Sequence, residues 1–176
     1  MIRRPGRSRR GVAAVEVAFV TTFLLVPLLI GVWELGRVVQ VKQVVSNAAR
    51  EGARQAAQGY TVNASGSPTQ VTVSSGAANV TDVVYNYLLA AGLTNLQKSD
   101  VTVTFQFLTP RSDGAAAAEP YQGEKGQQFA VTGTIPWDKV RWVNLGILNP
   151  TQVSFTVNWR MLNDDKFTVD TTLPSW

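Results

Sequence analysis

Side chains that commonly perform catalysis are scarce in this sequence. It contains no Cys and no His, which removes disulfides, thiolate metal sites and the commonest general base and metal ligand. Catalytic triads that depend on His are therefore excluded. Three C-terminal carboxylates could bind a divalent cation, although a solvated turn is the simpler interpretation: Asp164, Asp165 and Asp170. No glycine-rich phosphate loop follows an expected strand. We expect no enzyme activity, no metal, no cofactor and no small-molecule substrate.

The basic charge is concentrated at the N-terminus. The chain has 16 Lys and Arg against 12 Asp and Glu, a formal charge of +4. Five of the basic residues fall within the first ten positions: Arg3, Arg4, Arg7, Arg9 and Arg10. Without them, eleven basic residues face twelve acidic ones. The basic character therefore belongs to a short leader, which is typical of a nucleic-acid arm or of the positive flank of a membrane segment.

An uncharged apolar run decides between these two interpretations. Residues 17–33 read VAFVTTFLLVPLLIGVW, and a helix of about 20 residues crosses a bilayer core of about 30 Å. The residues after the run, 33–37, lack the small-residue site of a cleavable signal. A buried core helix would normally show a polar stripe. We expect a transmembrane helix over 12–35, with the N-terminus in the cytoplasm and residues 59–176 outside, and no nucleic-acid partner.

A carboxylate at the edge of this run needs a physical reason. Glu16 lies four residues after Val12, and an unpaired carboxylate there is costly. If the chain is cut after Gly11, the new amine of Val12 lies one helical turn from Glu16, or meets Glu16 of a neighbouring subunit. Such a charge pair offsets desolvation and sets the axial register of packed helices.

These residues resemble a known family. The run GVAAVEV at 11–17 looks like the processing site of type IV prepilin-like proteins. Residues 9–57 as a whole are similar to the TadE-like pseudopilins of tight-adherence, Flp-type pilus systems. The shared features are RRGVAAVE at 9–16, a proline within the apolar run, ELGR at 34–37 and NAAREGAR at 47–54. Position 17 departs from the family, which often has Phe or Tyr where this chain has Val.

The resemblance implies both processing and location. A prepilin peptidase would remove leader 1–11 by cutting between Gly11 and Val12, leaving a minor pilin-like subunit in the bacterial inner membrane or in an extracellular pilus. Its partners would be the peptidase, other pilin-like subunits, the assembly platform and membrane lipid. The alternative is a signal-anchored extracytoplasmic binding domain unrelated to pili, in which Glu16 has no assembly role.

Beyond the membrane the helix becomes amphipathic over 36–58. Apolar positions recur at spacings of three and four: Leu35, Val38, Val39, Val41, Val44, Val45, Ala48, Ala49, Ala53 and Ala56. Local ion pairs are expected for Glu34 with Arg37, and for Glu51 with Arg50 or Arg54. We expect Pro27 to kink the helix, and Gly31 and Gly36 to allow close helix approach.

The outer domain is expected to be α+β, with a mostly antiparallel sheet of three or four strands and one additional short helix. The resemblance implies that this sheet packs on the amphipathic helix, as in pilins. The predicted elements are a polar linker at 60–68, strands at 70–74, 100–108, 127–136 and 151–162, a helix at 77–91 and an exposed loop at 109–126. Residues 137–148 are expected to form a short helix or an irregular apolar ledge.

Two further patterns remain open at this stage. Trp137 and Trp142 are expected either to pack in the core or to anchor a partner. Asn63 and Asn79 match the glycosylation acceptor pattern.

Overall fold

The computed structural model describes residues 10–141 and 150–162. The expectations for Trp142 and for the carboxylates Asp164, Asp165 and Asp170 lie outside these residues. The chain divides into two compact units, one of Met1–Gln40 with Arg141–Asn149 and one of Val41–Val140 with Pro150–Trp176. The architecture is α+β, with one long N-terminal helical segment and two small, mostly antiparallel sheets, as the sequence predicts.

The long segment is helical from Arg10 to Gln58 and consists of α1 (Arg10–Val20), a π-helix (Thr21–Leu25) and α2 (Val26–Gln58). The π-helix lies directly before Pro27, and the Val26 N–H donates to the carbonyl of Thr21, five residues earlier. Proline lacks an N–H, and its ring clashes with the carbonyl four residues back. The wider π turn accommodates that defect within a helical path.

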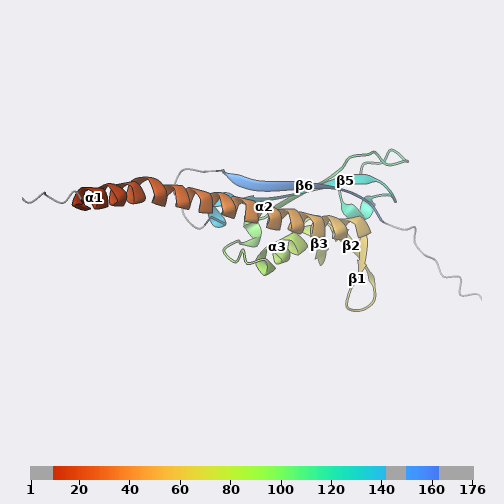
Figure 1. Cartoon of the computed structure of the whole chain (residues 1–176). Helices are drawn as coiled ribbons and strands as arrows, with labels where there is room; N and C mark the ends of the chain where they lie inside the picture. Colours follow the sequence, from red (N-terminus) through yellow and green to blue (C-terminus); the bar gives the residue numbers. More distant parts are fainter. Residues whose placement is uncertain (1–9, 142–149, 163–176) are drawn as a thin grey trace, which may run out of the picture. The chain divides into compact units, whose positions relative to one another are not determined.

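In the second unit, α2 packs through small residues. Seven of its side chains between Val41 and Ala57 are at most 1% exposed: Val41, Val45, Ala48, Ala49, Ala53, Ala56 and Ala57. Strand β5 (Gln128–Pro136) and helix α3 (Val80–Ala90) lie on two different sides of this stretch (Figure 1). A Cβ built on Gly133 of β5 would lie 3.8 Å from the Cβ of Ala49. The alanine face is therefore the core of this unit.

The larger sheet has the strand order β4-β5-β6 and is antiparallel throughout. Its strands are β4 (Thr102–Phe107), β5 (Gln128–Pro136) and β6 (Gln152–Arg160). Inward side chains alternate with Thr, Ser, Gln and Asn on the other face, which is the pattern of a sheet with one packed face. The rings of Phe105 and Phe129 lie 5.1 Å apart within the packed face. Trp137 at the end of β5 is fully buried, so it is a core residue.

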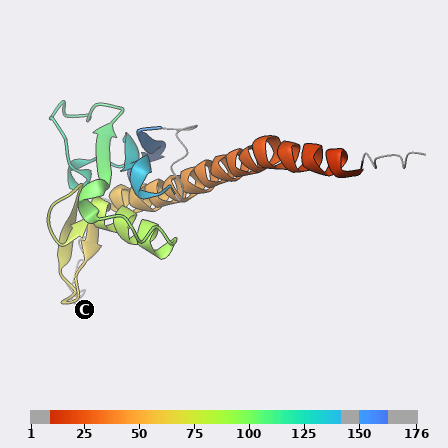
Figure 2. The same cartoon turned by 90° about the vertical axis from the view of Figure 1, so that its left-hand side faces the viewer.

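The second sheet corrects the prediction for residues 60–68. That stretch was expected to be a linker, but it contains β1 (Tyr60–Val62), which pairs antiparallel with β2 (Pro68–Thr72). Figure 2 shows this hairpin in yellow, following the C-terminal end of α2. Strand β3 (Ala78–Asn79) pairs with β2 in parallel. The single sheet expected from the sequence is therefore two sheets.

The amphipathic pattern of α2 is also corrected at its beginning. Leu35 and Val39 belong to the predicted apolar periodicity, yet they are 54% and 56% exposed. Both precede Val41, where the second unit begins. The apolar periodicity starts before the part of the helix that this unit buries.

Candidate assembly site in the N-terminal helix

The residues proposed for processing and register lie in the first two turns of α1. Gly11, Val12 and Glu16 all belong to α1, and all three are exposed. Residues four apart on a helix are neighbours on its surface, so the Glu16 carboxylate extends from the turn that follows Val12. A Cβ built on Gly11 would have no atom within 4 Å, so the backbone here is open to another molecule.

The helix that follows is exposed and apolar. Twelve of its large apolar side chains are 43% to 70% exposed: Val12, Val15, Val17, Phe19, Val20, Phe23, Leu24, Leu25, Val26, Leu28, Leu29 and Val32. The helix Gly11–Gln58 contains an 18-residue window with mean hydropathy 2.3, none of it buried within the chain. By length and composition this helix can cross a membrane. An apolar surface of this size is unfavourable in water, and lipid or other apolar helices remove that cost.

Glu34, Gly36 and Arg37 lie in α2 just after the apolar run, but they are not equivalent. Glu34 is only 9% exposed, and its Oε2 atom accepts no hydrogen bond from the described residues. The Arg37 guanidinium donates to the Gln40 side chain at 3.1 Å. A Cβ built on Gly36 would have no atom within 4 Å. Gly36 therefore remains open for the close helix approach expected from the sequence.

Comparison with known proteins bears on this same segment. Residues 11–54 match the family model of TadE-like proteins. The match confirms the resemblance inferred from the leader boundary, the apolar run and the NAAREGAR stretch. It begins at Gly11 and ends at Arg54, so it covers the helical segment except for the last turn of α2. No curated protein and no solved structure matches the chain.

The TadE-like segment ends in a polar helix face with local contacts. The Arg54 guanidinium forms an ion pair with Glu51 at 2.5 Å. The Arg50 side chain donates a hydrogen bond to the Asn47 side chain at 3.5 Å. Of the two arginines expected to pair with Glu51, Arg54 is therefore the one that does so among the described residues. Both arginines are exposed, and surface pairs of this kind contribute little to stability because water and salt screen them.

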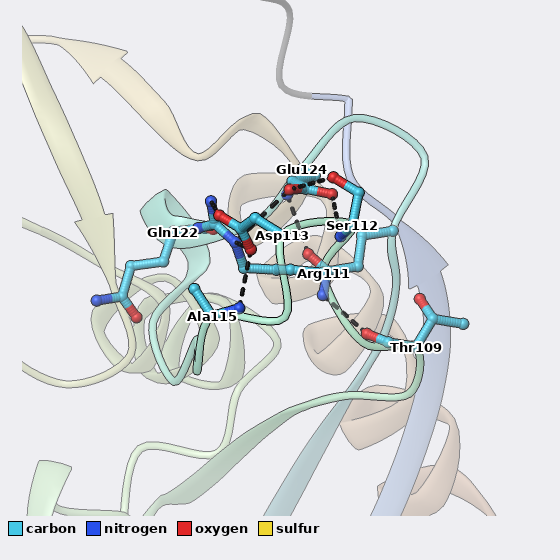
Figure 3. Close-up of polar contacts among 8 residues, drawn as sticks. Thr109, Arg111, Ser112, Asp113, Ala115, Gln122 and Glu124 are labelled. Carbon is cyan, nitrogen blue, oxygen red and sulfur yellow. Dashed lines mark hydrogen bonds and ion pairs between the residues drawn. The ribbon is translucent and has the colours of Figure 1, made fainter.

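Downstream of the TadE-like segment, the loop expected over 109–126 has defined polar contacts (Figure 3). The Arg111 guanidinium forms an ion pair with Asp113 at 2.8 Å and donates to the Gln122 carbonyl at 2.5 Å. The Glu124 carboxylate accepts from both the N–H and the hydroxyl of Ser112, each at 2.9 Å. The pKa of the Arg111 guanidinium is raised, and its hydrogen bond to the Asp113 carboxylate is the largest cause. These contacts hold the loop in a defined conformation.

The two asparagines of the glycosylation pattern have structural roles. Asn79 is 3% exposed and caps α3: its side-chain oxygen accepts from the Asp82 N–H at 2.7 Å, and its amide donates to the Asp82 carboxylate at 2.8 Å. The Asn63 side chain accepts from the N–H groups of Ser65 and Ser67 in the β1–β2 turn. Asn79, with an acidic residue three positions later, is a helix-start signal that the sequence contains.

Gly52, within the matched residues 11–54, has a packing role that was not predicted from the sequence. A Cβ built on Gly52 would lie 2.7 Å from Cγ2 of Val84 and 3.0 Å from Cγ1 of Val80. Of the three glycines in α2, Gly52 is therefore the one that lies against α3. A glycine inside an otherwise favourable helical pattern is the signal that could have identified it.

Proposed function

We propose that this chain is a minor pseudopilin of a tight-adherence pilus or a related secretion apparatus. The observation that carries the proposal is the match of residues 11–54 to the TadE-like family, a structural family associated with pili. The match coincides with an exposed apolar helix that can cross a membrane. In this proposal a prepilin peptidase cuts between Gly11 and Val12, on the cytoplasmic side of the inner membrane.

The removed leader has two functions in this account. Its arginines orient the chain with the N-terminus in the cytoplasm, and it places Gly11 at the membrane border. Cleavage then creates a charged amine at Val12, one turn from Glu16. The two charges pair within one subunit or between neighbours, which lowers the desolvation cost of Glu16 and selects one axial register among packed helices.

The outer domain is extracytoplasmic in this proposal, and the helix anchors it until assembly. The partners are the peptidase, the assembly platform, other pilin-like subunits and membrane lipid. Gly36 and Gly31, which have no neighbouring atom within 4 Å of a built Cβ, leave room for helices of other subunits. Glu34 and Arg37 mark the outer border of the membrane segment.

The deciding experiment is mass spectrometry of the protein recovered from cells with an active prepilin peptidase. We expect a mature chain that begins at Val12, and we expect Gly11→Leu to retain residues 1–11. Gly36→Leu is the matched control, because Gly36 is an equally open helical glycine downstream of the cleavage site. Recovery of wild-type chains that begin at Met1 would contradict processing and favour a signal-anchored domain unrelated to pili.

A second variant separates processing from assembly. We expect Glu16→Gln to be cleaved normally and to fail in piliation, because the amide keeps the size of the side chain and removes the charge. Glu51→Gln is the control, since Glu51 is a carboxylate of the same helical segment, in α2, and pairs with Arg54. Normal piliation by Glu16→Gln would refute the charge-pair account while leaving the processing proposal intact.

A further inference from the structure

The π-helix deprives one carbonyl of the apolar helix of its main-chain donor. Within this π-helix (Thr21–Leu25), the Val26 N–H donates to the carbonyl of Thr21. In this five-residue register the next N–H along the chain, that of residue 27, would donate to the carbonyl of Thr22. Residue 27 is a proline and has no N–H. The Thr22 carbonyl therefore receives no hydrogen bond from the position that should supply it.

Such an acceptor is costly at the depth where it lies. Residue 22 is close to the midpoint of the expected span 12–35, and residues 11–29 are all exposed. The core of a bilayer offers no water to a backbone carbonyl, so each polar backbone group there needs a partner within the protein. The donor to Thr22 is then a side chain, either of this helix or of another one.

The same helix has no side chain suited to this role. A hydroxyl on a helix reaches back to the carbonyl three or four residues earlier, so a donor to Thr22 would have to stand at position 25 or 26. These positions are Leu25 and Val26, whose side chains have no polar atom. The donor must therefore come from a different helix in the membrane.

A second copy of this helix has donors at the required depth. The run 17–33 contains three residues with polar side chains, namely Thr21, Thr22 and Trp33. Trp33 is eleven residues beyond Thr22, a distance of about 16 Å along a helix. In two copies inserted in the same direction, the threonine hydroxyls of one lie within a helical turn of the Thr22 carbonyl of the other. Because a two-fold pair is reciprocal, two copies provide a donor for both carbonyls.

Small residues on the same face allow the close approach that such hydrogen bonds need. Ala14, Ala18 and Thr22 follow one another at spacings of four, so they lie along one face of the helix, and all three are exposed. Small side chains at this spacing let two helix backbones approach closely in a membrane. The face that carries Thr22 is therefore the one on which a neighbouring hydroxyl can reach the backbone.

We propose that two copies of this chain associate in the membrane through the face of Ala14, Ala18 and Thr22. The hydroxyls of Thr21 and Thr22 of each copy donate to the Thr22 carbonyl of the other. This contact requires only that the helix lies in a bilayer. It goes beyond the proposed function and does not depend on cleavage after Gly11, so either proposal can fail without the other.

Energy transfer in vesicles measures this association. The full chain, which has no Cys, is labelled as the Asn86→Cys variant, at an exposed position of α3. Donor-labelled and acceptor-labelled chains are reconstituted together in vesicles of phosphatidylethanolamine and phosphatidylglycerol, and transfer is followed as lipid is added. We expect Thr21→Val/Thr22→Val, which keeps the side-chain shape and removes both hydroxyls, to raise the dissociation constant ~10-fold. Thr21→Ser/Thr22→Ser keeps both hydroxyls and should preserve the association.

Val26→Thr distinguishes this contact from a general attraction between polar side chains. A hydroxyl at position 26 reaches back to the Thr22 carbonyl of its own helix and removes the need for a partner. We therefore expect self-association to weaken by at least ~5-fold, although the helix has gained a polar group. Val20→Thr is the matched control, because its hydroxyl meets the Glu16 carbonyl, which already accepts the Val20 N–H within α1. We expect no weakening in this control.

Three results would overturn the proposal. The first is a labelled chain, without further substitution, that stays monomeric at every lipid dilution. The second is unchanged association of the double valine variant, and the third is a Val26→Thr variant that associates as tightly as Val20→Thr. Association that requires a different pilin-like subunit would overturn it as well, because the donor to Thr22 would then belong to that subunit.

Discussion

Gly52 provides a quantitative test of the contact between α2 and α3. It is buried in the C-terminal part of α2, and a Cβ at this position would lie 2.7 Å from Val84 and 3.0 Å from Val80. Both contacts are closer than carbon atoms normally approach. Val80 and Val84 are at most 1% exposed, and β-branched side chains are stiff at χ1. Neither valine yields without moving its neighbours.

Two opposing effects set the size of the change in Gly52→Ala. Alanine is favoured over glycine in a helix interior by about 1 kcal/mol. Inserting a methyl group into a packed core costs about 1–3 kcal/mol, and two stiff neighbours place the cost in the upper part of that range. We expect a net loss of about 1–2 kcal/mol, which lowers the melting temperature by about 4–8 °C for a unit of this size.

The assay is thermal unfolding of the full chain in detergent, followed by near-ultraviolet circular dichroism, for Gly52→Ala, Val84→Ala and the double variant. Val84→Ala removes the methyl group that the new Cβ would meet, so we expect a favourable coupling of about 1 kcal/mol or more in the double-mutant cycle. A rise in melting temperature for Gly52→Ala alone, as at an exposed helical glycine, would refute the close approach of the two helices.

Three further changes test other contacts of the outer domain. Asn79→Ala removes the cap of α3 and should destabilise by about 1 kcal/mol in chemical denaturation, whereas equal stability would show that the cap is replaceable. Lys98, and then Asn79, lower the pKa of the Asp82 carboxyl; its stabilising contribution is therefore full above the ordinary carboxyl pKa and is lost as pH falls through the lowered value. Asp82→Asn should flatten the acid limb of a stability–pH profile below about pH 4, and an unchanged limb would contradict this assignment. Arg111→Ala removes the donor to the Gln122 carbonyl and should increase proteolysis within 109–126 relative to Arg50→Ala, since loops without such contacts open locally.

Local patterns were sufficient to predict many of the elements. Strand β5 was expected over 127–136 and is found over Gln128–Pro136, because its apolar residues alternate without interruption. Helix α3 was expected over 77–91 and begins three residues later, at Val80. The strand formed by Ala78–Asn79 accounts for the difference, and its pairing with β2 is a non-local interaction that periodicity does not encode.

The hairpin of β1 and β2 shows why the remaining elements were missed. Residues 60–68 contain Asn, Ser, Gly and Pro, the composition of a linker. The Asn63 side chain nevertheless closes a turn with Ser65 and Ser67, and the flanking residues pair across it. Strand pairing stabilises a stretch whose own propensity is weak, because sheet stability comes from cross-strand contacts.

The sequence by itself determined the N-terminal third. The Arg-rich leader, Gly11, Glu16 and the uncharged run are features of order along the chain, and the family match over residues 11–54 covers the last three of them. Only the tertiary structure decided which small residues of that helix are buried, since Ala48 and Leu35 fit the same periodicity but only Ala48 faces the core. It also decided that Gly52 meets Val84 and that β5 lies between β4 and β6 in the larger sheet. The physical reason is that burial and close approach depend on which distant segments meet, whereas membrane insertion depends on the local composition of a single helix.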